Sequence, residues 1–170
     1  MTVDEAAKLL CECFLSGGKV LVCGNGGSAA DAGHFVGELV GAFRRRDRAP
    51  LPALSLCTDH AVLTAIANDF GFKEVFARQV VAHGHAGDLL IAISTSGNSE
   101  DVLEAVSAAR VLDMGVIALT CGTGGQLALE TSNVLCAPTR DTAEGQEWHM
   151  KVLHQIAGIV EAQMFPVGRA

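Results

Sequence analysis

The sequence has no tyrosine, one tryptophan and four prolines, and only 18% of its 170 residues are charged. Hydrophobic residues make up 49% of the chain, and the mean hydropathy is +0.34. A chain with so few charges can bury enough apolar surface to offset the entropy of folding, which excludes disorder for most of its length. Because aromatic residues are scarce, we expect a core of valine, leucine, isoleucine and alanine, as in closely packed α/β layers.

Positive charge is also scarce. The chain has 12 Lys and Arg against 19 Asp and Glu, a net charge of −7 and a pI of about 5.2. This balance argues against a protein that binds the phosphate backbone of nucleic acid, and we expect no nucleic-acid partner. The one local exception is a basic cluster that contains Arg44, Arg45, Arg46 and Arg48.

Long apolar runs and a basic amino-terminal segment are missing as well. No run approaches the roughly 18 residues of a membrane span, and Asp4 and Glu5 stand where a signal peptide would be basic. The cysteines are scattered, which is typical of buried thiols in a reducing compartment and not of a disulfide framework; they are Cys11, Cys13, Cys23, Cys57, Cys121 and Cys136. We therefore expect a cytoplasmic protein with no membrane partner.

Short apolar runs alternate with segments of helical periodicity along the chain. Runs without polar alternation predict strands buried on both faces, at 19–23, 53–57, 88–94, 115–121 and 133–137. Helices are predicted from the 3.6-residue period, at 2–16, 28–43, 58–68, 74–83, 98–114, 126–131 and 143–164. This alternation predicts an α/β fold, a three-layer αβα sandwich on a five-stranded parallel sheet. We expect one domain over residues 1–170, with 44–52 as an exposed connection.

Three predicted strands are followed by loops of small residues that lead into helices, at 24–28, 94–99 and 122–125. Backbone amides, hydroxyls and a helix dipole can hold a phosphate there without a lysine or arginine. The first loop matches the dinucleotide pattern G-x-G-x-x-A, but the acidic residue expected after the second strand is missing. An ordinary tight turn is the alternative for each loop, although four hydroxyls within 94–99 favour phosphate binding.

A second group of polar residues lies on the helix that the first loop opens. His34 and Glu38 are four residues apart, so both project from one face of the helix. Three interpretations of this pair are open: it forms half of a metal site, it is an acid/base pair, or it is an exposed polar pair. Gln146, His149 and His154 on the last helix are candidate partners.

Several motifs appear in the order in which a known family carries them. They are 23–32 (CGNGGSAADA), His34 with Phe35, 38–41 (ELVG), 65–72 (AIANDFGF), 75–79 (VFARQ), 93–99 (ISTSGNS), and Gln146 and Glu147 with His149 and His154. On these motifs the sequence resembles the phosphoheptose isomerases, a family of sugar isomerase (SIS) domains, over nearly its whole length. The resemblance implies a flavodoxin-like SIS fold.

The resemblance also implies a reaction. Members convert D-sedoheptulose 7-phosphate to D-glycero-D-manno-heptose 7-phosphate through an enediol, which opens the synthesis of nucleotide-activated heptoses. They are typically homotetramers, with active sites between subunits and a zinc ion. The implied partners of this chain are therefore a small sugar-phosphate substrate and further copies of itself, and the implied cofactor is Zn²⁺.

Site residues follow from the resemblance, motif by motif. Zinc would be bound by His34, Glu38, Gln146 and His154. The sugar phosphate would be held by Asn25, Gly26, Gly27, Asn68, Asp69, Ser94, Thr95, Ser96, Ser99 and Gln146. Glu38 would transfer the proton, His154 would be the partner acid, and Asp69 would assist ring opening. Gln146 and His154 are about 12 Å apart along an ideal helix, so a shared ion requires Gln146 in the first turn and leaning back.

The sequence departs from the family pattern at several places. Gly33 and Gly37 stand where relatives usually have larger residues, and Ala42 where they commonly have arginine. The dipeptide 144–145 (EG) replaces a basic and an aliphatic residue. Two other functions remain open: a non-catalytic SIS adaptor that binds a replication initiator protein, and a sugar-phosphate-sensing module. The presence of both Glu38 and His154 favours the enzyme.

Overall fold

The structure, a computed structural model, describes residues 1–166. Its strands are β1 (Val20–Gly24), β2 (Ala53–Ser55), β3 (Leu89–Ile93), β4 (Gly115–Cys121) and β5 (Val134–Ala137). Its helices are α1 (Val3–Leu15), α2 (Gly27–Val40), α3 (His60–Phe70), α4 (Ala77–His83), α5 (Glu100–Val111), α6 (Leu127–Glu130) and α7 (Thr142–Met164), with a 3-10 turn, η1, at Phe72–Glu74. The predicted domain extends to residue 170, and residues 167–170 lie outside the described part.

The strands form one parallel sheet in the order β2-β1-β3-β4-β5. This order is the flavodoxin-like one, and it confirms the predicted fold class. The direction of the chain crossovers reverses between β1 and β3, so the loops that follow these two strands diverge and leave a crevice at their carboxyl ends. Such a crevice is the usual ligand position in an open parallel sheet.

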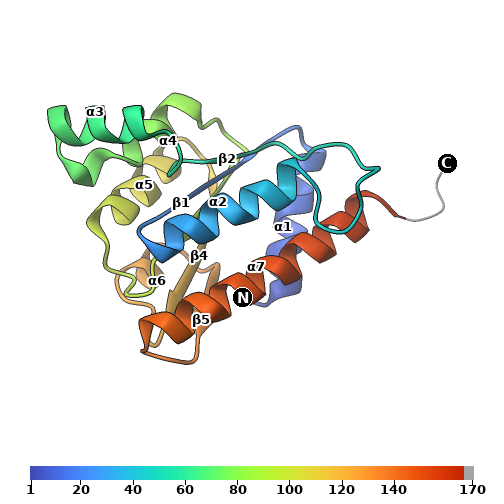
Figure 1. The fold of residues 1–170 in the computed structure, drawn as a ribbon. Coiled ribbons are helices and arrows are strands. Elements are labelled where there is room, and N and C mark those ends of the chain that lie inside the picture. Colours follow the sequence, from blue (N-terminus) through green and yellow to red (C-terminus); the bar gives the residue numbers. More distant parts are fainter. Residues whose placement is uncertain (167–170) are drawn as a thin grey trace.

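Helices cover both faces of the sheet (Figure 1). On one face, α1, α2 and α7 pack into a core around Leu10, Phe35, Ile91 and Leu153. On the other face, α4, α5 and α6 pack around Val80, Leu90 and Val106, among other residues. Both cores are aliphatic, as expected from the composition. Among residues 1–166, no helix combines the length and the apolar character that crossing a bilayer requires.

The predictions fail in detail at the sheet edge and in one loop. β2 is shorter than predicted, and Leu54 is 37% exposed, because β2 is an edge strand and has a neighbour on one side only. The connection 44–52, predicted to be exposed, is exposed at most of its residues, but Arg45 and Arg48 are partly buried and Leu51 is buried. The Arg48 side chain is 1% exposed and forms an ion pair with Glu161 of α7. A partner so distant in sequence gives no local signal.

Asp88, just before β3, joins the amino ends of two strands. Its carboxylate accepts hydrogen bonds from the Lys19 backbone N–H at 2.9 Å, the Lys19 Nζ at 2.6 Å and the His85 N–H at 2.8 Å. Burial raises the pKa of Asp88, but these hydrogen bonds outweigh it and hold the pKa below its usual value of 3.8. The charged form therefore stabilises the fold.

We expect Asp88→Asn to lower the free energy of unfolding at pH 7 by about 1.5–3 kcal/mol, since charge-assisted hydrogen bonds are lost. Because the folded-state pKa lies below the unfolded one, the Asp88 contribution is present above about pH 4 and is lost as the pH falls further. The gap between wild type and variant should therefore narrow below pH 4. Urea denaturation at a series of pH values measures this, and a constant gap would contradict it.

Candidate active site

The loop after β1 leads into α2 and leaves the first turn of that helix without a side-chain cap. Gly26 has a φ of +55°, which favours glycine, and no side chain caps the first turn of α2. By contrast, Thr2, Asp59 and Asp141 cap the helices α1, α3 and α7. The Asn25 amide nitrogen donates to both carboxylate oxygens of Asp101, at 3.0 and 2.8 Å. The free start of α2 is therefore suited to bind an anion.

The loop after β3 gathers hydroxyl groups at the start of α5, another helix without a side-chain cap. The Ser94 hydroxyl lies 3.0 Å from that of Ser99 and 3.4 Å from that of Ser96. Gly97 turns the loop with a φ of +66°, and a Cβ at this position would overlap the Gly124 carbonyl. Since β1 and β3 are neighbours, this loop and 24–28 end at the same edge of the sheet.

Asp101 was not among the predicted site residues. Its position in the first turn of α5 suggests only a helix start, whereas the structure shows it 4% exposed and bonded to Asn25. Burial raises the pKa of Asp101, and the hydrogen bond from Asn25 lowers it in part. A carboxylate only accepts hydrogen bonds, so Asp101 fixes the Asn25 NH₂ toward itself and leaves the Asn25 carbonyl oxygen for another partner.

The first turns of α7 lie against the start of α2. The Gln146 amide sits over Gly27, where a Cβ would overlap it. Gly145 makes this approach possible on the other side, because a Cβ there would overlap the Cys121 sulfur and lie 3.6 Å from a Thr95 methyl. The departure at residue 145 thus has a packing reason. The position of Gln146 favours the predicted role in substrate binding, and its role as a metal ligand stays a prediction.

Further along the same two helices, His34, Glu38 and His154 come together. The His34 Nε2 lies 3.0 Å from the Glu38 Oε1 and 3.1 Å from the His154 Nε2, and the His154 Nε2 lies 3.2 Å from the same oxygen. The Glu38 side chain is 11% exposed, against 51% for His34 and 40% for His154. Its second oxygen, Oε2, is buried and has no hydrogen-bond partner among residues 1–166.

This cluster fits a zinc ion. Imidazole nitrogens and a carboxylate oxygen are ordinary zinc ligands, and tetrahedral coordination separates neighbouring ligand atoms by about 3.3 Å. The three observed separations are close to this value, and the two imidazole nitrogens face each other, an arrangement that a shared cation stabilises. Three ligands from the described chain would leave a fourth position for Gln146, water or substrate.

The far side of His154 borders a cavity of about 370 Å³. Phe43 stacks on the His154 ring with the centroids 5.8 Å apart, and the Arg44 guanidinium lies 5.1 Å from the Phe43 centroid. Phe43 therefore limits the rotation of the imidazole. Nothing in the local sequence singled it out, because it follows the end of α2 and meets His154 only in the fold.

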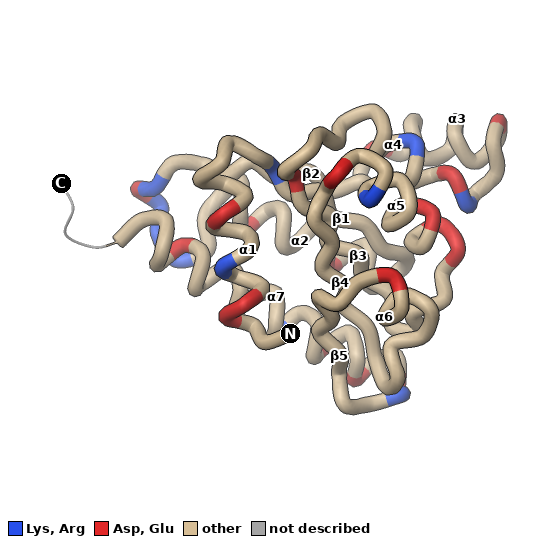
Figure 2. The backbone as a smooth tube through the Cα atoms, turned by 180° about the vertical axis from the view of Figure 1, so that it is seen from behind, with Lys and Arg blue, Asp and Glu red and all other residues tan. Residues whose placement is uncertain are grey.

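Asn68 and Asp69 lie apart from these residues, near the end of α3. The Asn68 amide donates to the Asp69 carboxylate at 2.7 Å, and both side chains are exposed. Within residues 1–166 neither forms a hydrogen bond with the loops after β1 and β3 or with the cluster. No residue of α3 is buried, and the helix protrudes at one end of the molecule (Figures 1 and 2).

Comparisons with known proteins indicate one family. The sequence model of the SIS domain family matches residues 1–121. A phosphoheptose isomerase from Laribacter hongkongensis is 50% identical over 163 residues, which cover 94% of this chain and 83% of that protein. This chain belongs to the phosphoheptose isomerases. Two solved phosphoheptose isomerase structures share the fold. The one from Neisseria gonorrhoeae is 46% identical with a TM-score of 0.88, and the match covers 94% of this chain and 85% of that chain. The one from Francisella tularensis is 43% identical with a TM-score of 0.89, and the match covers 93% of this chain and 84% of that chain.

Membership of the phosphoheptose isomerases confirms the predicted family, fold class and enzyme class. It counts against the adaptor and the sensing module, since the relatives at this level of identity are named as isomerases. The roles of individual residues stay predictions. The structure places the two loops and Gln146 at the start of α2, and His34, Glu38 and His154 together further along α2 and α7. Asn68 and Asp69 lie apart from both groups, near the end of α3.

The contact between Gly145 and Cys121 predicts a compensating pair of substitutions. Gly145→Ala should destabilise the protein by about 1–3 kcal/mol, because the added Cβ overlaps the buried sulfur. Cys121→Ala removes that sulfur, so the double variant should recover much of the loss. Denaturation of the wild type, both single variants and the double variant gives the coupling energy. Strictly additive effects would contradict the packing argument.

Proposed function

We propose that this chain converts D-sedoheptulose 7-phosphate to D-glycero-D-manno-heptose 7-phosphate, the first step of nucleotide-activated heptose synthesis. The observation that carries the proposal is the cluster that His34 and Glu38, on the helix that begins at the Gly26 loop, form with His154 of α7, in a member of the phosphoheptose isomerases. One helix thus connects a site for an anion with a site for acid–base chemistry.

The phosphate binds at the carboxyl ends of β1 and β3. The uncapped starts of α2 and α5 supply backbone N–H groups, and Ser94, Thr95, Ser96 and Ser99 supply hydroxyls. The Asn25 carbonyl, left free by Asp101, accepts a hydrogen bond from a sugar hydroxyl, and Gln146 faces the same loop across Gly27. These contacts fix the sugar chain along α2.

Glu38 is the proton-transferring base. Its carboxylate lies beside the two imidazoles, and it takes the proton from C1 of the ketose. The electron pair of that bond forms the C1=C2 double bond, and the C2 oxygen takes a proton from His154. In the second half, Glu38 returns a proton to C2, and the C1 hydroxyl loses its proton to His154.

The residues that would hold zinc are His34, Glu38 and His154, with Gln146 as a further ligand. When bound, zinc supplies positive charge that stabilises the oxygens of the enediol. His34 has no other assigned role, and its exposed ring leaves room for a ligand atom beside the cluster.

The active protein is a homo-oligomer with sites shared between subunits. The resemblance to the family implies a tetramer. Support comes from α3, whose residues are all at least partly exposed, and from Phe72, which is 60% exposed beside it. An isolated helix of this length is marginal in water without packing of its apolar face. A second copy that covers α3 would bring Asn68 and Asp69 to a neighbouring site, where Asp69 assists ring opening.

The cysteines support a cytoplasmic location. All six are free thiols, and burial raises the pKa of Cys13 to about 11, which keeps that thiol protonated at neutral pH. Unpaired buried thiols are typical of a reducing compartment.

The main test is turnover of sedoheptulose 7-phosphate by the wild type and by Glu38→Gln. The variant keeps the shape and an oxygen donor but lacks the basic carboxylate. Because general base catalysis contributes about 10²–10⁴-fold, its turnover should fall below about 1% of wild type, while sugar-phosphate binding measured by calorimetry persists.

An active Glu38→Gln protein would exclude Glu38 as the base. A wild type that binds zinc and the sugar phosphate but forms no aldose would contradict the isomerase and support a sensing module. As a control, Glu130→Gln changes an exposed carboxylate that is paired with Arg110, and it should leave turnover unchanged.

Light scattering tests the assembly. The wild type should be a dimer or tetramer at micromolar concentration, and Phe72→Asp should shift it toward smaller species and lower turnover. Leu129→Asp is the matched control, because Leu129 is also an exposed apolar residue, 77% accessible, but lies on α6. A monomeric wild type with full activity would contradict shared sites.

A further inference from the structure

Helices α2 and α7 run side by side in the same direction and touch at three levels. Gln146 meets Gly27 at the first level, and His154 meets His34 and Glu38 at the second. At the third, Glu161 of α7 meets the segment that follows the end of α2. The first two levels have assigned roles, whereas the third is a buried ion pair that the proposed function does not use.

Glu161 gathers four donors although its side chain is only 5% exposed. It accepts hydrogen bonds from the backbone N–H groups of Phe43, Arg44 and Arg45, at 3.0 to 3.3 Å, and from the Arg48 Nε at 2.8 Å. Figure 2 shows acidic and basic residues side by side at this end of the molecule. Both Glu161 oxygens are satisfied, so the carboxylate ties the segment after α2 to α7.

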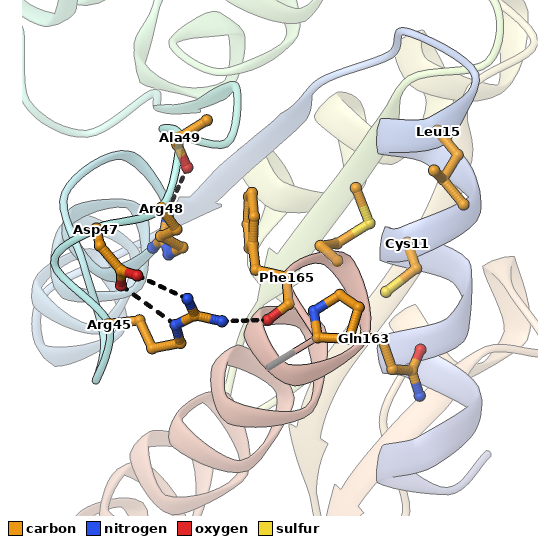
Figure 3. A pocket seen from close by; sticks show the side chains of 10 residues that line it. Cys11, Leu15, Arg45, Asp47, Arg48, Ala49, Gln163 and Phe165 are labelled. Atoms are coloured by element: carbon orange, nitrogen blue, oxygen red, sulfur yellow. Dashed lines mark hydrogen bonds and ion pairs between the residues drawn. The ribbon is translucent and has the colours of Figure 1, made fainter. Parts of the chain in front are cut away.

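Arg48 completes the connection by binding the end of α2. Its Nη1 donates to the carbonyls of Leu39 and Ala49, each at 2.9 Å, and its Nη2 donates to the carbonyl of Glu38. The last carbonyls of a helix have no partner within the helix, and a guanidinium satisfies them well. Figure 3 shows the hydrogen bond of Arg48 to the Ala49 carbonyl, whereas Arg45 binds Asp47 and the Phe165 carbonyl.

The same guanidinium therefore holds the backbone of Glu38 and a side chain of α7. Glu161 lies about two turns after His154 and so on the same face of α7. We propose that Arg48, paired with Glu161, is a positioning residue for the reaction: it sets Glu38 against His34 and His154 so that the cluster can bind zinc and Glu38 can transfer the proton. This inference rests on the proposed function and adds a determinant outside the substrate site.

Stability alone does not account for such a pair. Burying two charges has a large desolvation cost, and apolar residues of similar volume often serve stability equally well. The apolar contacts of α1, α2 and α7 already hold the layer together. By contrast, three ligand atoms from two helices stay within 3.2 Å of one another only if the helices do not slide or rotate. The directional bonds of Arg48 provide that restraint.

The test uses the double variant Arg48→Met/Glu161→Gln, which removes both charges and so leaves no unpaired buried ion. With its amide oxygen in the place of Oε1, the glutamine can still accept the backbone N–H groups of Arg44 and Arg45. Zinc affinity of the metal-free protein, measured by competition with a chelator, should weaken about 10–100-fold, as when groups that orient metal ligands are removed. The kcat should fall, while the KM stays within about threefold because the phosphate loops are unchanged.

Asp88→Asn is the matched control. Asp88 is also a buried carboxylate with backbone and side-chain donors, but its donors are Lys19 and His85, and none of them belongs to α2 or α7. This control should lose thermal stability and keep wild-type zinc affinity and kcat. If the double variant behaves like the control, the pair is structural only and the proposal is wrong.

Arg48→Lys covers the case in which the double variant does not fold. A lysine keeps the charge beside Glu161 but lacks the second nitrogen that reaches the Glu38 carbonyl. The zinc affinity of this variant should therefore weaken by a smaller factor than that of the double variant. A zinc affinity equal to that of the wild type would overturn the proposal.

A wild type that binds zinc without turning over sugar phosphate would contradict the proposed function, and the zinc measurement would still decide the role of Arg48.

Discussion

The contact between α2 and α7 is the constraint on which the candidate site depends. These helices come from opposite halves of the chain, and each carries only part of the chemistry: α2 has His34 and Glu38, and α7 has Gln146 and His154. Two glycines allow the close packing at the start of α7. Gly27 leaves room for the Gln146 amide at the start of α2, and Gly145 lets α7 lie against Cys121 of β4.

The fold could be predicted from the sequence because its signals are local. Continuous apolar runs mark β1, β3 and β4, and capping residues and glycines mark the helix ends, so the order of elements follows from periodicity. β2 was predicted too long because an edge strand needs less apolar sequence than a central one, and its run continues into buried residues beyond the sheet. The strand order did not follow from these local signals, and the flavodoxin-like fold was implied by the resemblance to the family.

The candidate site was predictable only in part. Residues on one loop or one helix face, such as the serines of 94–99 or the pair His34 and Glu38, have a spacing that can be read directly. The resemblance to a family was needed to connect them with His154. Asp101, Phe43, Arg48 and Glu161 were missed because each acts through a partner distant in the chain. Their residue types are also common at helix starts, in loops and on exposed helix faces.

Helix α2 has a further consequence for the size of the substrate. It begins at the proposed phosphate site and carries His34 and Glu38 further along its length, at a rise of about 1.5 Å per residue. In the proposed function, the distance between the phosphate and the reacting carbons would therefore be set by a rigid helix and not by a flexible loop. A sugar phosphate with a shorter carbon chain, held by its phosphate, would not bring its carbonyl as far as Glu38. A single helix would then select the substrate by its chain length.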